Sequence, residues 1–202
     1  MSVKTTETAR LLDLAQKQPI LRVRDLVGPK IHPEHLRRLW AKGVMERTSR
    51  GVYRLVGAEY TAHLSLAEVA KRVPRGVICL ISALQFHGIG TQLPPDVWLA
   101  VDRRAARPAS MNPRLRVVRL SGRAFSEGVE KKVIDGVRVQ IYSAAKTVVD
   151  CFKFRNKVGQ DVVLEALREG WRSRKVTMKD LVYFSKVCRV EKAIRPYLES
   201  LA

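Results

Sequence analysis

The order of elements predicted in the first 56 residues constrains the fold of this chain more than any other feature of its sequence. Apolar residues at helical spacing predict a first helix within residues 6–16. Residues 22–27 are typical of a short second helix, which a Gly-Pro pair ends. A third helix begins at Pro33 and ends at Gly43. Three short helices with tight connections indicate a helix-turn-helix unit.

A hairpin is predicted directly after the third helix. Residues 44–55 contain two short apolar segments on either side of a polar turn, with Arg50 and Gly51 at its tip. Helices followed by such a hairpin are the elements of a winged helix-turn-helix domain. We therefore predict a DNA-binding domain of this class over residues 1–56.

The third helix has an apolar face and a charged face. At 100° per residue, Leu36, Leu39 and Trp40 fall together, and we expect them to pack inward. The residues expected outside or on the flanks are Glu34, His35, Arg37, Arg38, Ala41 and Lys42. A recognition helix places such residues in the major groove, where arginine commonly binds guanine.

These positions define the candidate contacts with DNA. The candidates are His32, Glu34, His35, Arg37, Arg38, Lys42, Arg47 and Arg50. Arg37 and Arg38 are expected at base edges, and the two histidines and the glutamate are candidates for reading or excluding bases. The other three are expected to meet phosphate or the minor groove. A solvated helix face on a protein-binding winged helix is the alternative.

The charge of the chain favours a polyanionic partner. Lysine and arginine number 38 against 19 acidic residues, and the excess is +7 in residues 1–56 and +12 in residues 57–202. Repulsion among these excess positive charges does not help folding, whereas binding to nucleic acid would offset the charge. Membrane surfaces usually attract a long amphipathic helix or a polybasic tail, and the sequence has neither. A basic surface that only keeps the protein soluble is the alternative.

Cysteine and histidine patterns predict no metal or cofactor site. Cys79, Cys151 and Cys188 lie far apart, and His32 and His35 have no cluster of further ligands nearby. No run of 18 apolar residues occurs, and the N-terminus has no apolar signal stretch. We therefore expect a cytoplasmic protein.

Residues 57–202 are expected to form a second, α+β domain with a small sheet and several helices. The expected elements are a buried helix within residues 77–88, a half-buried strand at 97–102, a strand at 115–120, a hairpin around Asp135 and Gly136, and four amphipathic helices after residue 143. The loop between the first two strands carries Arg103, Arg104 and Arg107, which we expect to extend a DNA footprint or to contact RNA.

Two patterns suggest catalysis, and both lack the rest of an active site. Ser143 and Lys146 have the spacing of a serine nucleophile and its lysine base, but the other motifs of that site are missing. Ser143 is better explained as a helix N-cap, and Lys146 with Asp150 as a surface pair. Asp96 and Asp102 flank one strand without a closely spaced acidic pair. We therefore expect that the protein is not an enzyme.

The sequence resembles the AbiEi family of type IV antitoxins along nearly its whole length. One stretch is LRRLWAKGVMERTSRGVYR at residues 36–54. The more specific pattern is ISALQFHG at 81–88, VWLAV at 97–101 and VQIYSAAKTVVDCF at 139–152, in that order.

The resemblance implies a winged-helix repressor that binds inverted repeats in the promoter of its own operon. It also implies a functional partner, a nucleotidyltransferase-like toxin of a phage-defence system, which the antitoxin counters without forming a stable complex. Carried over to this chain, base and phosphate contacts fall on Arg37, Arg38, Lys42, Arg47 and Arg50. The alternative is a nucleic-acid-processing enzyme, or an accessory subunit of one, that uses the winged helix for targeting.

Overall fold

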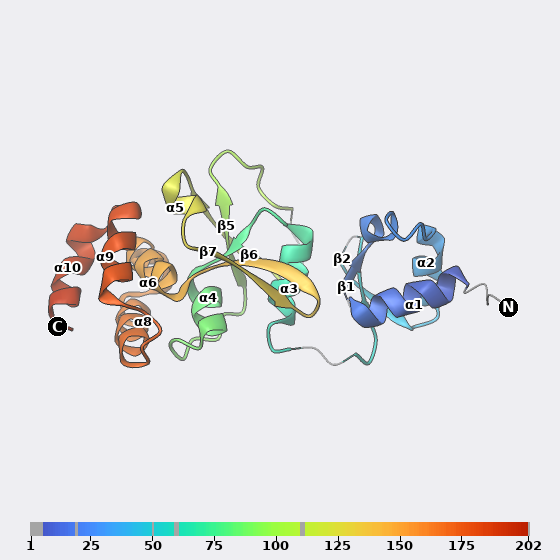
Figure 1. The fold of residues 1–202 in the computed structure, drawn as a ribbon, viewed down its shortest axis with the longest axis horizontal. Helices are drawn as coiled ribbons and strands as arrows, with labels where there is room; N and C mark the ends of the chain where they lie inside the picture. The colour runs from blue at the N-terminus through green and yellow to red at the C-terminus, as the bar shows by residue number, and fades with distance from the viewer. Residues whose placement is uncertain (1–5, 19, 50, 59–60, 110–111, 202) are drawn as a thin grey trace. The chain divides into compact units, whose positions relative to one another are not determined.

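The chain forms two compact units (Figure 1). The computed structural model describes residues 6–18, 20–49, 51–58, 61–109 and 112–201. One unit contains Met1–Pro74, Met111–Pro113 and Val133–Val139, and the other contains Arg75–Ser110, Arg114–Lys132 and Gln140–Ala202. The domain boundary expected after Val56 stays a prediction, since the first unit continues beyond it.

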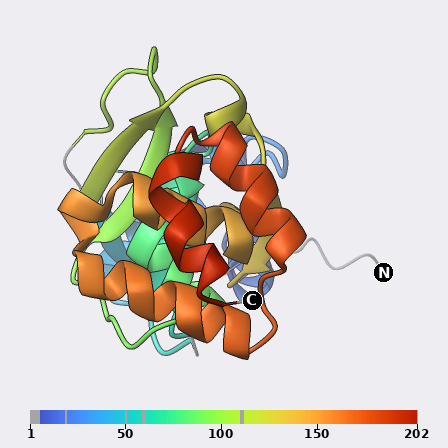
Figure 2. The same ribbon diagram turned by 90° about the vertical axis from the view of Figure 1, so that its left-hand side faces the viewer.

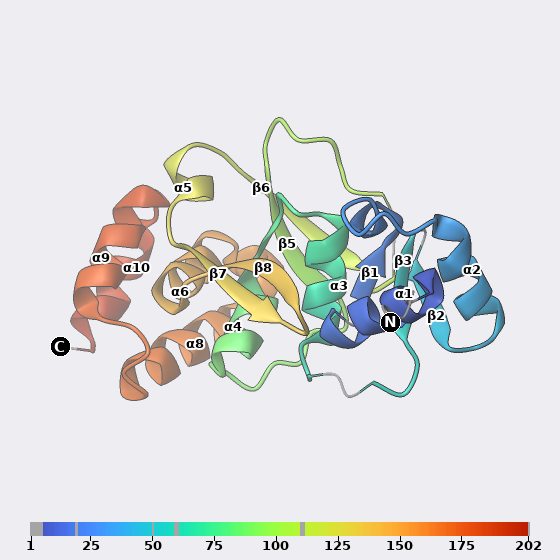
Figure 3. The ribbon, with the colours of Figure 1, turned by 45° about the vertical axis from the view of Figure 1, so that its right-hand side comes forward.

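The first unit begins with the predicted helices and hairpin (Figure 3). Its elements up to residue 55 are α1 (Glu7–Lys17), β1 (Ile20–Arg22), the 3-10 helix η1 (Val23–Leu26), α2 (Pro33–Ala41), β2 (Met45–Ser49) and β3 (Val52–Leu55). The three strands form an antiparallel sheet in the order β1-β3-β2. This arrangement is consistent with the predicted winged helix.

The second predicted helix differs from the expectation for residues 22–27. Arg22 belongs to β1 and pairs with Val52, so only four residues remain for a helical turn. The backbone N–H of Arg22 donates to the carboxylate of Asp25 at 2.7 Å, and Val27 closes the turn onto Arg24. A segment this short forms a 3-10 turn more readily than an α-helix.

Both flanking helices begin with side-chain caps. Thr6 accepts a hydrogen bond from the backbone N–H of Ala9 at the start of α1. His32 caps α2 in the same way by accepting from Glu34, and Pro33 occupies the first turn, where a missing N–H costs nothing. After α2, Gly43 adopts φ +70°, which ends the helix.

The first unit also contains α3 (Leu64–Arg72). Its N-cap is His63, and Glu68 lies 3.8 Å from the guanidinium of Arg54. Burial is the largest influence on the Glu68 carboxyl and raises its pKa.

The second unit contains most of a five-stranded mixed sheet, of which the hairpin segment Val133–Val139 is counted with the first unit. Its strands are β4 (Val77–Ile78), β5 (Val97–Asp102), β6 (Leu115–Leu120), β7 (Val129–Ile134) and β8 (Val137–Tyr142), in the order β6-β5-β4-β8-β7. β5 runs parallel to β6 and antiparallel to β4, which is parallel to β8. Asp135 and Gly136 both have positive φ in the turn between β7 and β8, which confirms the predicted hairpin.

Two expectations for the second unit are corrected by the central position of β4. The apolar run expected to be one helix divides into β4 and α4 (Leu80–His87), with Gly88 ending α4 in the left-handed conformation. The strand expected to be half-buried, β5, is buried at every position except Asp102. It lies between β4 and β6 in the sheet, and successive residues, which point to opposite faces, are both buried, so both of its faces are covered.

Helices complete the second unit. They are α5 (Arg123–Ser126), α6 (Ala144–Lys153), α7 (Arg155–Val158), α8 (Gln160–Arg172), α9 (Met178–Val187) and α10 (Glu191–Glu199). α6 contacts α4, α8, α9 and α10, and the later helices are coloured orange to red in Figure 2. The hydroxyl of Ser143 caps α6, as expected, and the hydroxyl of Thr177 caps α9. The fold class is α+β, as predicted.

The expected surface pair of Lys146 and Asp150 is instead an ion pair in the core. Only 0% and 1% of these side chains are exposed. The ammonium group of Lys146 lies 4.1 Å from the ring centroid of Tyr142, and the thiol of Cys188 donates to Asp150 at 3.3 Å. Lys146 and Asp150 face the core because α6 is covered on several sides by neighbouring helices.

Candidate nucleic-acid interface

Helix α2 presents two arginines on its exposed face. Leu36 and Leu39 are 0% and 5% exposed and pack in the core of the first unit with residues of α1 and β2. This packing orients the helix, so that the side chains of Arg37 and Arg38 are 71% and 67% exposed. The predicted outward direction of both arginines is confirmed.

Glu34 modulates the charge of this face. Its carboxylate lies 3.7 Å from Arg37 and 3.9 Å from Arg38, in the first turn of α2. Both distances are long and all three side chains are well exposed, so the attraction is weak and leaves the arginines free to reorient. A glutamate here lowers the positive potential of the helix face without removing it.

The expected inward position of Trp40 is wrong. Its side chain is 45% exposed, and the guanidinium of Arg47 on β2 lies 6.0 Å from the ring centroid. Leu36 and Leu39 already fill the core side of α2, and Trp40 lies at the edge of that apolar face. The ring instead forms a cation–π contact that connects α2 with the wing.

His35 connects two helices within the first unit. Its Nδ1 lies 3.0 Å from the hydroxyl of Thr8, and its Nε2 lies 3.2 Å from the carboxylate of Glu7. Glu7 also accepts from the backbone N–H of His32 at 3.0 Å, which lowers the pKa of the Glu7 carboxyl. These contacts turn His35 toward α1 and fix the angle between α1 and α2.

The other candidates in the first unit lie at the ends of α2 and on the wing. His32 is exposed and its ring nitrogen is used as the N-cap. Lys42 is the exposed C-cap of α2, and Arg47 is exposed on β2. Arg50 lies outside the described residues. The structure thus brings Arg37, Arg38, Lys42 and Arg47 together with Trp40 around α2 and the first wing strand.

Arg103, Arg104 and Arg107 lie in the second unit, on the loop that joins β5 to β6. All three are exposed. The backbone N–H of Arg104 donates to Asp102 at 2.8 Å, which orders the start of the loop. Parallel strands are usually connected by a helix, whereas this loop connects the parallel strands β5 and β6. It carries the three exposed arginines.

The side chains considered for catalysis have structural contacts. The ammonium group of Lys146 is engaged by Asp150, and the hydroxyl of Ser143 accepts from the backbone N–H of Lys146, so they do not form a nucleophile–base pair. Burial raises the pKa of the Cys188 thiol to about 12 and raises that of Cys79 and Cys151 as well. No cluster of three potential metal ligands occurs among the described residues.

Sequence comparison connects the first unit with a known family. Residues 9–56 match the family described as "Transcriptional regulator, AbiEi antitoxin", and this range contains every candidate DNA contact of the first unit. The similarity to this family therefore lies in the N-terminal region. No curated protein sequence matches the chain.

The fold of most of the chain has a solved counterpart. The crystal structure of the RV2827C protein from Mycobacterium tuberculosis superposes with a TM-score of 0.62, covering 89% of this chain and 71% of that chain at 12% sequence identity. At this identity the likeness concerns the fold alone. None of the helices in the described part of the chain is long and apolar enough to cross a membrane.

Proposed function

We propose that this chain is a DNA-binding antitoxin that represses its own operon by binding inverted repeats in the promoter. The observation that carries the proposal is the pair of exposed arginines, Arg37 and Arg38, on α2 of the AbiEi region. Their guanidinium groups project from the helix that follows the turn, which is the recognition helix of a helix-turn-helix domain.

Different roles follow from the positions of the cations. Arg37 and Arg38 lie on the outer face of α2 and can donate two parallel hydrogen bonds to guanine. Lys42 and Arg47 lie at the end of α2 and on the wing, where the phosphate backbone passes beside a helix seated in the major groove. Arg50, at the predicted tip of the wing, is proposed for the same backbone.

The two histidines stabilise the position of the recognition helix. His35 connects α2 to α1, and His32 caps α2, so both hold the recognition helix in position. The negative charge of Glu34 weakens the attraction of this helix face for DNA of any sequence. It thereby favours DNA sites at which Arg37 and Arg38 can also bind base edges. On this account, affinity comes from the cations and selectivity from the two arginines with Glu34.

The second part of the proposal concerns the toxin. We propose that the chain acts in the cytoplasm against a nucleotidyltransferase-like toxin without holding it in a stable complex. The family described for residues 9–56 supports the antitoxin role. Co-expression of the toxin with and without this chain tests neutralisation, and size-exclusion chromatography of the two purified proteins tests complex formation.

Fluorescence anisotropy tests the DNA-binding proposal directly. The full chain is titrated with the upstream promoter duplex and with a scrambled duplex of equal length, each at two salt concentrations. A specific repressor should prefer the promoter by about a thousandfold or more. Equal and steeply salt-dependent binding would contradict sequence recognition, and no binding to either duplex would contradict DNA binding altogether.

A further inference from the structure

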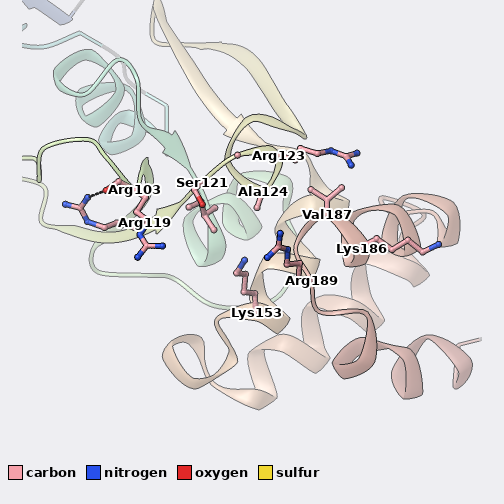
Figure 4. A pocket seen from close by; sticks show the side chains of 11 residues that line it. Arg103, Arg119, Ser121, Arg123, Ala124, Lys153, Lys186, Val187 and Arg189 are labelled. Atoms are coloured by element: carbon pink, nitrogen blue, oxygen red, sulfur yellow. Dashed lines mark hydrogen bonds between the residues drawn. The ribbon is translucent and has the colours of Figure 1, made fainter.

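A basic hollow opens in the second unit (Figure 4). Its volume is about 570 Å³, which is within the range of pockets that hold small molecules. The segments around it are the loop after β5, the end of β6 with the turn that follows, and the C-terminal ends of α6 and α9. Four stretches far apart in the sequence therefore meet here.

The lining of this basic hollow contains six cations and no carboxylate. The cations are Arg103, Arg119, Arg123, Lys153, Lys186 and Arg189. Another hollow, along α8, shows the usual mixture, since Asp161, Glu165 and Glu169 line it together with Arg168 and Arg172. Six cations around one hollow repel one another, and a bound anion would relieve that repulsion.

Two of the cations are held in place without being neutralised. The guanidinium of Arg119 donates to the backbone carbonyls of Arg103 and Ala105 at 2.6 and 2.9 Å. The ammonium group of Lys153 donates to the carbonyl of Cys188 at 3.2 Å. Carbonyl partners order these side chains and leave their full charge available to a ligand.

Carboxylates close to the lining cations are also few among the described residues. Among the described residues, Glu127 is the carboxylate within ion-pair distance of any of the six cations, and it binds Arg123 at 2.5 Å. In Figure 4 the side chains of Lys153 and Arg189 point toward one another, whereas those of Arg123 and Lys186 extend outward. Lys153 and Arg189 are therefore central to the hollow.

Arg189 occupies a backbone position that favours glycine. It follows the C-cap of α9 with φ +59°, and the N–H groups of Arg189 and Val190 close onto Lys186 and Ser185. This is the Schellman end of a helix, where glycine avoids the strain of a left-handed residue. An arginine at this strained position places a guanidinium group in the lining of the basic hollow.

We propose that the basic hollow binds a compact anion with two or three linked phosphate groups, such as the triphosphate of a free nucleotide. Arginine and lysine donors suit phosphate oxygens, and several separate cations match several phosphates. The lining has no aromatic side chain on which a base could stack, so recognition is directed to the phosphates. A concave site of this volume suits a compact anion better than the convex backbone of a duplex.

Calorimetric titration of the full chain with tripolyphosphate, ATP and adenosine, at constant ionic strength, tests this proposal. We expect saturable one-to-one binding of tripolyphosphate and ATP and none of adenosine. Binding of ATP alone would show that the base is recognised and would contradict a phosphate site. Absence of binding by both phosphates would overturn the proposal.

Two glycine substitutions provide a matched pair. Arg189→Gly removes a lining charge and relieves a left-handed residue, so it should weaken tripolyphosphate binding about tenfold without lowering the melting temperature. Arg174→Gly removes the same charge and a similar left-handed conformation, φ +56°, after α8, outside the hollow. Equal effects of the two variants would overturn the proposal, because binding would then reflect overall charge.

DNA binding by the same variants separates the two sites. Arg189→Gly should leave the affinity for promoter and scrambled duplex within about twofold of wild type, because Arg189 is not among the proposed DNA contacts and a single exposed charge is largely screened by salt. If Arg189→Gly instead weakened duplex binding and tripolyphosphate did not bind, the hollow would be part of the DNA footprint and the proposal would be wrong.

Discussion

The ammonium group of Lys146 and the carboxylate of Asp150 form an ion pair one helical turn apart in α6, with 0% and 1% of their side chains exposed. Burial is the largest influence on Asp150 and raises the pKa of its carboxyl, while the nearby Lys146 opposes that shift. A buried charge without its partner is strongly unfavourable, so the pair holds α6 in one arrangement among its neighbours.

Removing one partner of this pair should destabilise the second unit. We expect Lys146→Met to lower the free energy of unfolding by roughly 3–5 kcal/mol, measured by chemical denaturation, because it leaves Asp150 buried and uncompensated. The exposed pair of Lys132 and Glu130 serves as a control, and Lys132→Met should change stability by about 1 kcal/mol or less. Similar losses from both substitutions would contradict the account of the core pair.

Glu34 should restrain DNA binding. Replacing it by glutamine removes a negative charge beside Arg37 and Arg38, and we expect the affinity for a scrambled duplex to rise several-fold, on the order of 1 kcal/mol. Glu191→Gln is the matched control, because Glu191 is equally exposed and pairs with Arg195 in α10. Anisotropy titrations measure both, and an equal rise in the two variants would show a general charge effect.

Trp40 should report on DNA directly. Its exposed ring contacts Arg47, whereas Trp98 is 4% exposed in the core of the second unit. Duplex binding should therefore change the tryptophan fluorescence of the wild-type chain, and the change should disappear in Trp40→Phe. Retention of the full change in this variant would place the DNA elsewhere.

His87 should make the stability of the second unit depend on pH. Burial lowers the pKa of its imidazole, and its Nε2–H donates to the carbonyl of Tyr142 at 2.7 Å. His87 binds a proton more readily in the unfolded chain than in the folded protein. The stabilisation by neutral His87 is therefore fully present above about pH 6.5 and is lost as the pH falls through the pKa of His87 in the folded protein.

The melting temperature measured over this interval tests the role of His87. It should fall less steeply in His87→Gln than in the wild type, since the amide can still donate to Tyr142 but does not titrate. Parallel curves for the two proteins would assign the pH dependence to other groups.

Much of the fold could be predicted because its signals are local. The cap at Ser143 and the turn at Asp135 and Gly136 each depend on a few adjacent residues. The same holds for α2, where Pro33 begins the helix and Gly43 follows its end. Such features are encoded by capping and backbone preferences, which act before the tertiary structure forms.

The remaining features depend on contacts between distant segments. Helical spacing groups Trp40 with the apolar face of α2, and its exposure follows only from the filled core and the neighbouring Arg47. Lys146 and Asp150 have the spacing of an ordinary surface pair, and the helices packed on α6 bury them. The basic hollow has no local signal because its cations come from separate parts of the chain.

The affinity of Arg38→Gln for the promoter and scrambled duplexes tests the central claim most directly, with the exposed Arg195→Gln as control. The account predicts that Arg38→Gln loses roughly 1–3 kcal/mol of binding to the promoter and much less to the scrambled duplex. It predicts little effect of Arg195→Gln on either. If Arg38→Gln binds its promoter as tightly as the wild type, α2 does not read the bases and the account is contradicted.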